Sequence, residues 1–158
     1  MMNRLTLSVL SLVAVAACAS VRADEAAIRK TIDAYVQAFN KKNLDAVAGY
    51  WAEQATHIDR ETGARTEGRE AIRADIAAVF EEQPNTMLVG SVDRVRFIKP
   101  DVASVEGQAS VGEMGEEPSV SSFSAILVQQ DGKWLIDSIE EMPLPQRSTP
   151  YDALRELE

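Results

Sequence analysis

The single histidine of the sequence, His57, lies two residues before Asp59. If this stretch forms a strand, both side chains project from the same face. A carboxylate beside an imidazole fixes the ring's tautomer, and such a pair can move protons near neutral pH. Two interpretations stay open. The pair either lines a pocket and takes part in acid–base chemistry, or it is a polar pair at a pocket opening, bonded to itself or to water.

Aromatic and hydroxyl side chains supply the other candidates. Tyr35 lies on the apolar face of an expected helix, where its O–H either points into an apolar cavity or is bonded within the core. Trp51 and Phe39 recur at helical spacing and are expected in the core or in a cavity wall. Ser122 and Glu106 reach the cavity only if their strand faces turn inward; otherwise they face solvent.

Several kinds of chemistry are not expected. The sequence contains neither the Cys and His spacing of a metal site nor a Gly-rich phosphate loop. It also has no Ser-His-Asp order and no candidate Cys nucleophile. We therefore expect no metal and no cofactor. Cys18 is the only cysteine, so no disulfide can form within the chain.

Composition narrows the class of protein. A chain of 158 residues with 46% hydrophobic content is typical of one domain with a modest core. The formal net charge is −9, and Lys and Arg are scattered singly along the chain. Because a basic patch is the usual footprint of nucleic-acid binding, we expect no nucleic-acid partner.

The N-terminus has the pattern of a targeting segment. An uncharged run, Leu5–Ala17, follows Arg4 and is too short to span a membrane. Cleavage after Ala23 would make residues 1–23 a signal peptide of an exported, periplasmic or secreted protein. Alternatively, the residues before Cys18 resemble a bacterial lipobox, and a lipid on Cys18 would then anchor the protein to a membrane.

Hydrophobic periodicity predicts helices first and strands afterwards, an order that favours an α+β fold. Asn43 is expected to cap the second helix. The predicted helices span 25–41, 44–54 and 69–82, and the predicted strands span 56–59, 65–66, 86–98, 102–112, 119–130 and 134–141. These elements form one domain over residues 24–142. A Pro-containing tail, 143–158, ends in a short helical pattern carried by Tyr151, Leu154 and Leu157.

The order of several weak motifs is similar to that of the nuclear transport factor 2-like superfamily, particularly its bacterial SnoaL-like members. The motifs are AYVQAFNKKNLDAVAGYWAEQATHID, TEGREAIRADI and VQQDGKWLIDS, which together cover most of residues 24–141. The resemblance implies a cystatin-like α+β roll: a cone-shaped, curved antiparallel sheet that wraps around the N-terminal helices. It also implies a pocket at the wide end of the cone and a homodimer formed through the outer sheet face.

Within the superfamily, the first half of the chain resembles ketosteroid isomerase in the pattern YVxAxNxxxLDxxxxxxAxxATxxD. By position, Tyr35 matches the phenol that donates to a developing enolate, and Asp59 matches the carboxylate that carries the proton. A poorly solvated Asp59 would have a raised pKa, as a general base needs. Ser124 stands where the isomerases carry a protonated acid, which is a departure from their pattern.

Three functions follow from these patterns. The first is a small-molecule-binding domain whose pocket takes a small apolar or carbonyl-bearing molecule, lined by His57, Trp51, Phe39, Ser124 and Ser122. The second is a cofactor-independent isomerase, cyclase or dehydratase with Asp59 as base and Tyr35 as hydrogen-bond donor. The third is a dimerising interaction module. The departure at Ser124 favours the first.

Overall fold

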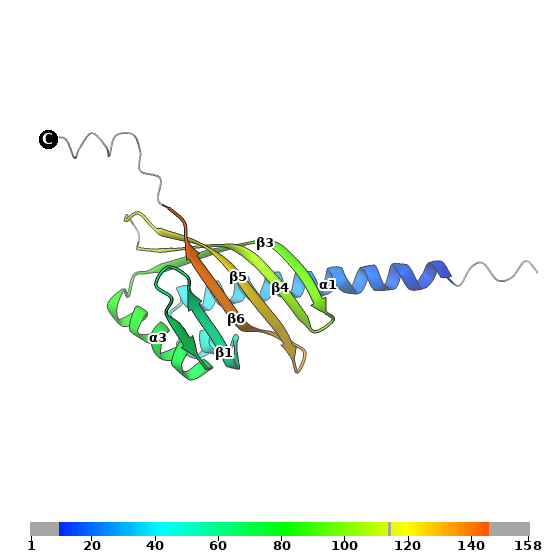
Figure 1. Ribbon diagram of the computed structural model, residues 1–158, viewed down its shortest axis with the longest axis horizontal. Coiled ribbons are helices and arrows are strands. Elements are labelled where there is room, and N and C mark those ends of the chain that lie inside the picture. The colour runs from blue at the N-terminus through cyan, green and yellow to red at the C-terminus, as the bar shows by residue number, and fades with distance from the viewer. Residues whose placement is uncertain (1–9, 114, 146–158) are drawn as a thin grey trace, which may run out of the picture.

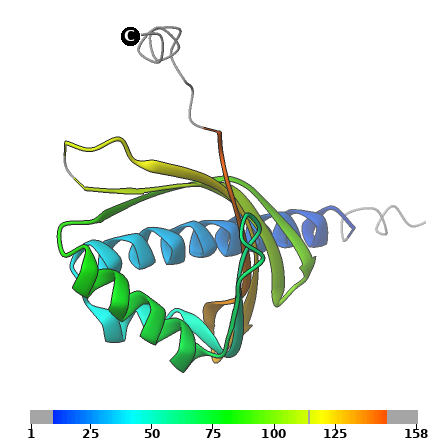
Figure 2. The ribbon, with the colours of Figure 1, turned by 60° about the vertical axis from the view of Figure 1, so that its left-hand side comes forward.

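A computed structural model of the chain describes residues 10–113 and 115–145. Within this part, helices pack on the concave side of one curved, six-stranded sheet with strand order β2-β1-β6-β5-β4-β3 (Figure 1). Turning the molecule shows α1 crossing the concave side of the sheet, with α3 lying against β1 (Figure 2). The elements are α1 (Leu10–Asn40), α2 (Leu44–Ala48), β1 (Trp51–Asp59), β2 (Arg65–Glu67), α3 (Arg69–Glu82), β3 (Met87–Lys99), β4 (Val102–Gly112), β5 (Ser119–Gln130) and β6 (Lys133–Pro143).

The α+β prediction is confirmed, and most element bounds agree with it. The predicted bounds of α3, β4 and β5 match those of the structure. Helix α1 begins at Leu10, earlier than predicted, and its predicted apolar face is buried: Ile28, Ile32 and Phe39 are all less than a tenth exposed. The short helix expected in the tail lies outside the described residues. Where the chain is described, no helix is long and apolar enough to cross a bilayer.

The second helix is shorter than predicted. Asn43 caps it as expected, accepting a hydrogen bond from the Ala46 N–H, but the helix ends at Ala48 rather than at Gln54. Trp51 then begins β1 and aligns with Ile136 of β6. A five-residue helix has little stability of its own, so pairing with β6 decides the conformation of the residues that follow it. The prediction that Trp51 lies on a helix is therefore wrong, although its inward direction is right.

The sheet departs from a purely antiparallel one at a single junction. Strands β3 to β6 form the predicted antiparallel meander, whereas β1 runs parallel to β6. This parallel pairing aligns His57 with Ile139 and Asp59 with Glu141. It therefore brings the first and last long strands together at one end of the cone.

A glycine in β4 permits the tight curvature of the sheet. A Cβ at Gly107 would lie 2.0 Å from the Ser91 carbonyl oxygen and 2.8 Å from Cζ of Phe123. The register between β3 and β4 shifts directly after Val92, and such bulges bend a strand. Gly107 therefore lets the Phe123 ring and the backbone of β3 approach β4 closely.

Side chains of α1 and of the turn that follows it bind backbone groups along the free edge of β3 and just before its first residue. Asn40 donates from Nδ2 to the Leu88 carbonyl at 2.8 Å and accepts from the Leu88 N–H at 2.7 Å. Arg29 donates to the Val92 carbonyl at 2.7 Å, and Lys42 donates to the Thr86 carbonyl. An edge strand otherwise presents unpaired backbone groups, and here the helix pairs several of them.

We predict that Asn40→Ala destabilises the protein by about 2 kcal/mol, because it leaves both backbone groups of the buried Leu88 without partners. Urea unfolding followed by circular dichroism measures the change. Thr31→Ala is the matched control, since Thr31 bonds only within its own helix, and it should stay within about 0.5 kcal/mol of wild type. If both variants lose the same free energy of unfolding, the two hydrogen bonds between Asn40 and Leu88 have no special role in stability.

Candidate functional site

An apolar cavity of about 130 Å³ lies between α1 and the inner faces of β3 to β6. Its walls are almost entirely aliphatic and aromatic, with Tyr35 and Glu141 as the polar exceptions. A dry cavity of similar size can hold a benzene-sized molecule. The lining residues are Ile32, Tyr35, Val36, Phe39, Leu88, Gly90, Ala109, Val111, Phe123, Ala125, Ile136, Ile139 and Glu141.

Two of the expected aromatic residues lie in or behind this wall. Phe39 is part of it and packs edge-on against Phe80 of α3, with ring centroids 4.9 Å apart. Trp51 is buried behind it, in edge-on contact with Tyr35 at 6.2 Å and with His57 at 6.4 Å. Trp51 thus supports two candidate polar groups instead of lining the cavity itself.

Tyr35 brings a phenol into the apolar wall. Burial raises the pKa of Tyr35 far above its ordinary value, and the Glu141 carboxylate adds to this effect. The neighbouring Trp51 indole lowers the pKa of Tyr35 and so opposes part of this rise. The indole N–H itself is buried and has no hydrogen-bond partner among the described residues. The Tyr35 O–H therefore stays protonated at neutral pH and remains a hydrogen-bond donor.

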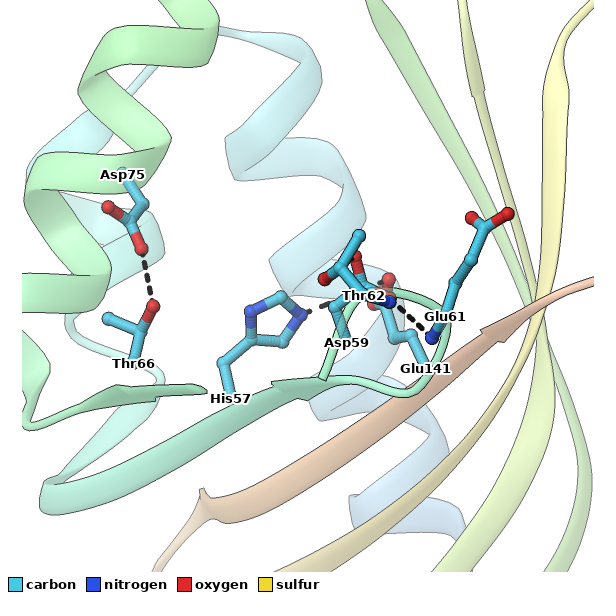
Figure 3. A network of polar contacts seen from close by, with 7 residues as sticks. All are labelled: His57, Asp59, Glu61, Thr62, Thr66, Asp75 and Glu141. Carbon is cyan, nitrogen blue, oxygen red and sulfur yellow. Dashed lines mark hydrogen bonds and ion pairs between the residues drawn. The ribbon is translucent and has the colours of Figure 1, made fainter. Parts of the chain in front are cut away.

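Glu141 is the acidic group of the cavity wall, and it was not predicted from the sequence. Its Oε2 lies 3.9 Å from Nε2 of His57, and the two side chains point toward each other across β1 and β6 (Figure 3). This contact, first among several, raises the pKa of His57, while partial burial opposes the rise. Asp75 and Asp59 add smaller contributions in the same direction.

Glu141 was not predicted at the cavity because the register between β5 and β6 shifts before it. Counting alternate residues from the buried Trp134 and Ile136 would turn Glu140 inward and Glu141 outward. The pairing of β5 and β6 shifts between Ile126 and Leu127, which reverses the alternation, so that Glu141 stands opposite the buried Phe123. The apolar Ile139, out of step with Ile136, was the available signal of this shift.

Asp59 does not have the raised pKa expected of a general base. Its carboxylate accepts hydrogen bonds from the Glu61 N–H at 2.8 Å, the Thr62 N–H at 3.2 Å and the Thr62 hydroxyl at 2.8 Å. These bonds, with that to the Thr62 hydroxyl first, lower the pKa of Asp59, and burial, a smaller effect than each of them, opposes the fall. The residue shares the inner face with His57, as predicted, but its side chain organises the β1–β2 turn (Figure 3).

Three strand residues considered for the cavity, of which Ser122 and Ser124 were expected to line it, lie on the other face of the sheet. Phe123 and Ala125 are the inward residues of β5, so Ser124 is exposed on the outer face, and Ser122 shares that face and contacts the Met142 carbonyl. Glu106 pairs with Arg94 outside the cavity. The pocket positions expected for Ser122 and Ser124 are therefore wrong.

A wide groove of about 970 Å³ leads to the cavity, and the two share Val111 and Glu141. Its walls include His57 and several carboxylates, and no Lys or Arg is among the described residues that line it. The carboxylates are those of Asp59, Glu82, Glu113, Glu116, Glu117 and Glu141. Among the described residues, no three acidic, His or Cys side chains are close enough together to hold a metal ion.

We predict that His57 titrates above 6.5 in the wild-type protein and that Glu141→Gln lowers its pKa, because the amide removes the principal cause of the rise. NMR titration of the imidazole carbons measures both values. Asp59→Asn is the control and should change the His57 pKa much less.

The raised pKa of His57 also makes the stability of the folded protein depend on pH. Because folding raises the His57 pKa, its stabilising contribution is complete below pH 6.5 and is lost as the pH rises through the folded-state value. A His57 pKa unchanged in Glu141→Gln would show that the two groups do not interact.

Comparison with known proteins agrees with this architecture. A cystatin-like domain of unknown function from Nostoc punctiforme is 26% identical, covers 85% of this chain and 92% of its own, and has a TM-score of 0.69. A putative scytalone dehydratase from Novosphingobium aromaticivorans has a TM-score of 0.71 at 15% identity, over 81% of this chain and 89% of its own.

A ketosteroid isomerase-like protein from Erwinia carotovora atroseptica has a TM-score of 0.63 at 17% identity, over 77% of this chain and 96% of its own. Among curated proteins, none matches the sequence. The family model of the SnoaL-like domain matches residues 32–135, well over half of the chain. The fold, the cone cavity and this match together show that the chain belongs to the SnoaL-like domain family.

Proposed function

We propose that this protein binds a small apolar molecule in the cone cavity. The supporting observation is the cavity itself: about 130 Å³ of apolar space with a protonated phenol in its wall and a carboxylate at its open end. Enclosed apolar space with few polar groups is the usual form of a small-molecule site. Filling it with side chains would have been the more stable solution for a purely structural domain.

A second candidate function is proton transfer on a bound carbonyl compound. The observation that favours it is the His57–Glu141 pair beside the neutral Tyr35 phenol, which supplies a proton acceptor and a donor at one end of the cavity. Asp59 is poorly suited to be the base, since its hydrogen bonds favour the ionised, weakly basic form. The likeness to dehydratase and isomerase structures supports only the common fold.

Export and self-association complete the proposal. The uncharged run near the N-terminus supports cleavage after Ala23, with lipidation of Cys18 as the alternative. The outer sheet face includes exposed apolar side chains such as Val89 and Met142, which suit the homodimer that the family resemblance implies. An interaction module that uses this face alone, without a ligand, is the remaining alternative.

We predict that benzene and phenol bind in the cavity and shift the methyl NMR signals of Ile139 and Val111, which lie in its wall. Ala109→Leu should abolish these shifts because Ala109 points into the cavity, whereas Ser110→Leu, on the opposite face of β4, should preserve them. A thermal melt of each variant establishes that it is folded. Equal shifts in both variants, or none in the wild type, would contradict the proposal.

We predict for the second function that the protein accelerates exchange of the α-protons of cyclohexanone in D₂O, measured by NMR. His57→Gln should remove the acceleration, and Asp59→Asn should retain it, since Asp59 is occupied by the turn. Exchange at the rate of the buffer alone, with cyclohexanone shown to bind, would leave binding as the function.

A further inference from the structure

The charges along the route into the cavity are of one sign. Glu141 is the charged residue of the cavity wall, and five more carboxylates line the groove in front of it. No Lys or Arg of the described chain lines either space, and His57 is the basic group of the route. The two spaces therefore join an apolar interior to an acidic entrance.

We propose that the ligand is a small amine whose apolar part, about the size of one ring, fills the cavity while its ammonium group binds Glu141. This inference rests on the proposed binding function and assigns its ligand class. The carboxylate stands at the junction of cavity and groove, where a molecule with its ring inside would present its polar end.

Glu141 has an unused capacity to accept hydrogen bonds. Among the described residues, no N–H or O–H donates to its side chain within hydrogen-bond distance, and its nearest cation, His57, stays at 3.9 Å. The side chain is 37% exposed, so it is partly removed from water. A primary ammonium group supplies three donors and a compensating charge, the combination that gives the stronger hydrogen bonds in proteins.

The neighbouring groups favour a cation over an anion. The Tyr35 ring lies in the same wall, and aromatic faces attract ammonium groups. Lys42 lies over the Phe39 and Phe80 rings and donates to the Thr86 carbonyl, and it is not among the residues that line the cavity. The groove carboxylates raise the local concentration of cations and disfavour a carboxylate ligand, as fields in charged clefts do.

Amine binding also displaces the existing contact of Glu141. The groups that face His57 are Glu141 from β6, Asp75 from α3 and Asp59 from β1, and the first has the largest effect. An ammonium group on Glu141 competes with protonated His57 for the same carboxylate. Binding should therefore release protons and lower the His57 pKa, which a molecule bound elsewhere on the surface would not do.

The test compares three probes of one shape and different charge: benzylamine, benzyl alcohol and benzoate, by calorimetry at neutral pH and low salt. Benzylamine should bind about tenfold more tightly than benzyl alcohol, the effect of one charge-assisted hydrogen bond, and benzoate should bind most weakly. Glu141→Gln should reduce benzylamine to the affinity of the alcohol. Glu117→Gln, which changes a groove residue outside the cavity wall, is the matched control and should retain most of the preference.

The outcomes separate this inference from the function on which it rests. Equal affinities of amine and alcohol, or an amine preference that survives Glu141→Gln, would overturn the amine assignment and leave binding in the cavity intact. Failure of all three probes, together with benzene and phenol, would overturn the proposed function as well. Amine binding that persists in Ala109→Leu would place the site outside the cavity and would also overturn the inference.

Discussion

The attachment of α1 to the free edge of β3 is the constraint on which the cavity depends. Asn40 bonds both backbone groups of Leu88, and Arg29 bonds the Val92 carbonyl further along the same edge. These contacts fix the helix across the concave side of the sheet without filling the space beneath it. Since Tyr35 and Phe39 lie on the helix between the two contacts, their rings stay at a set distance from the opposite wall.

The same attachment explains how a small domain keeps an apolar cavity. Ile28 is fully buried in the main core cluster and is not part of the cavity wall, so its burial stabilises the packing of α1 on the sheet. Beside the cavity, Phe39 of α1 packs with Leu88 of β3 in a second buried cluster, and the polar contacts along the edge of β3 act together with this packing. The sheet therefore does not need to collapse onto α1, and the residues around Ala109 remain partly unpacked.

Much of the fold could be predicted from the sequence because its signals are local. The apolar stripe of α1, the cap at Asn43 and the alternation in β4 each depend on a few neighbouring residues. The length of α2 could not be predicted, because pairing of Trp51 with a strand far along the chain outweighs local helical preference. Pairing partners of this kind are set by tertiary structure, which periodicity does not contain.

The candidate site was predicted only in part, because the turn contacts and strand register that place its side chains also depend on tertiary structure. His57 and Asp59 share a face as their spacing indicates, but Asp59 is taken up by the turn that begins beside it. Glu141 was missed because one register shift reverses which residues of β6 face inward. Ser124 was misplaced because the family resemblance was applied by position, whereas the buried neighbours Phe123 and Ala125 determine its direction.

The parallel pairing of β1 with β6 has a consequence for how the protein acquires its site during folding. The two strands are far apart in sequence: Arg60, directly after β1, pairs with Glu140 of β6, 80 positions away. Closing so long a loop is slow compared with forming α3 or the β3–β4 hairpin. The helices and strands β3 to β5 precede β6 in the chain, so they are synthesised before it. The acidic end of the cavity is complete only once β6 has docked, because Glu141 belongs to that strand.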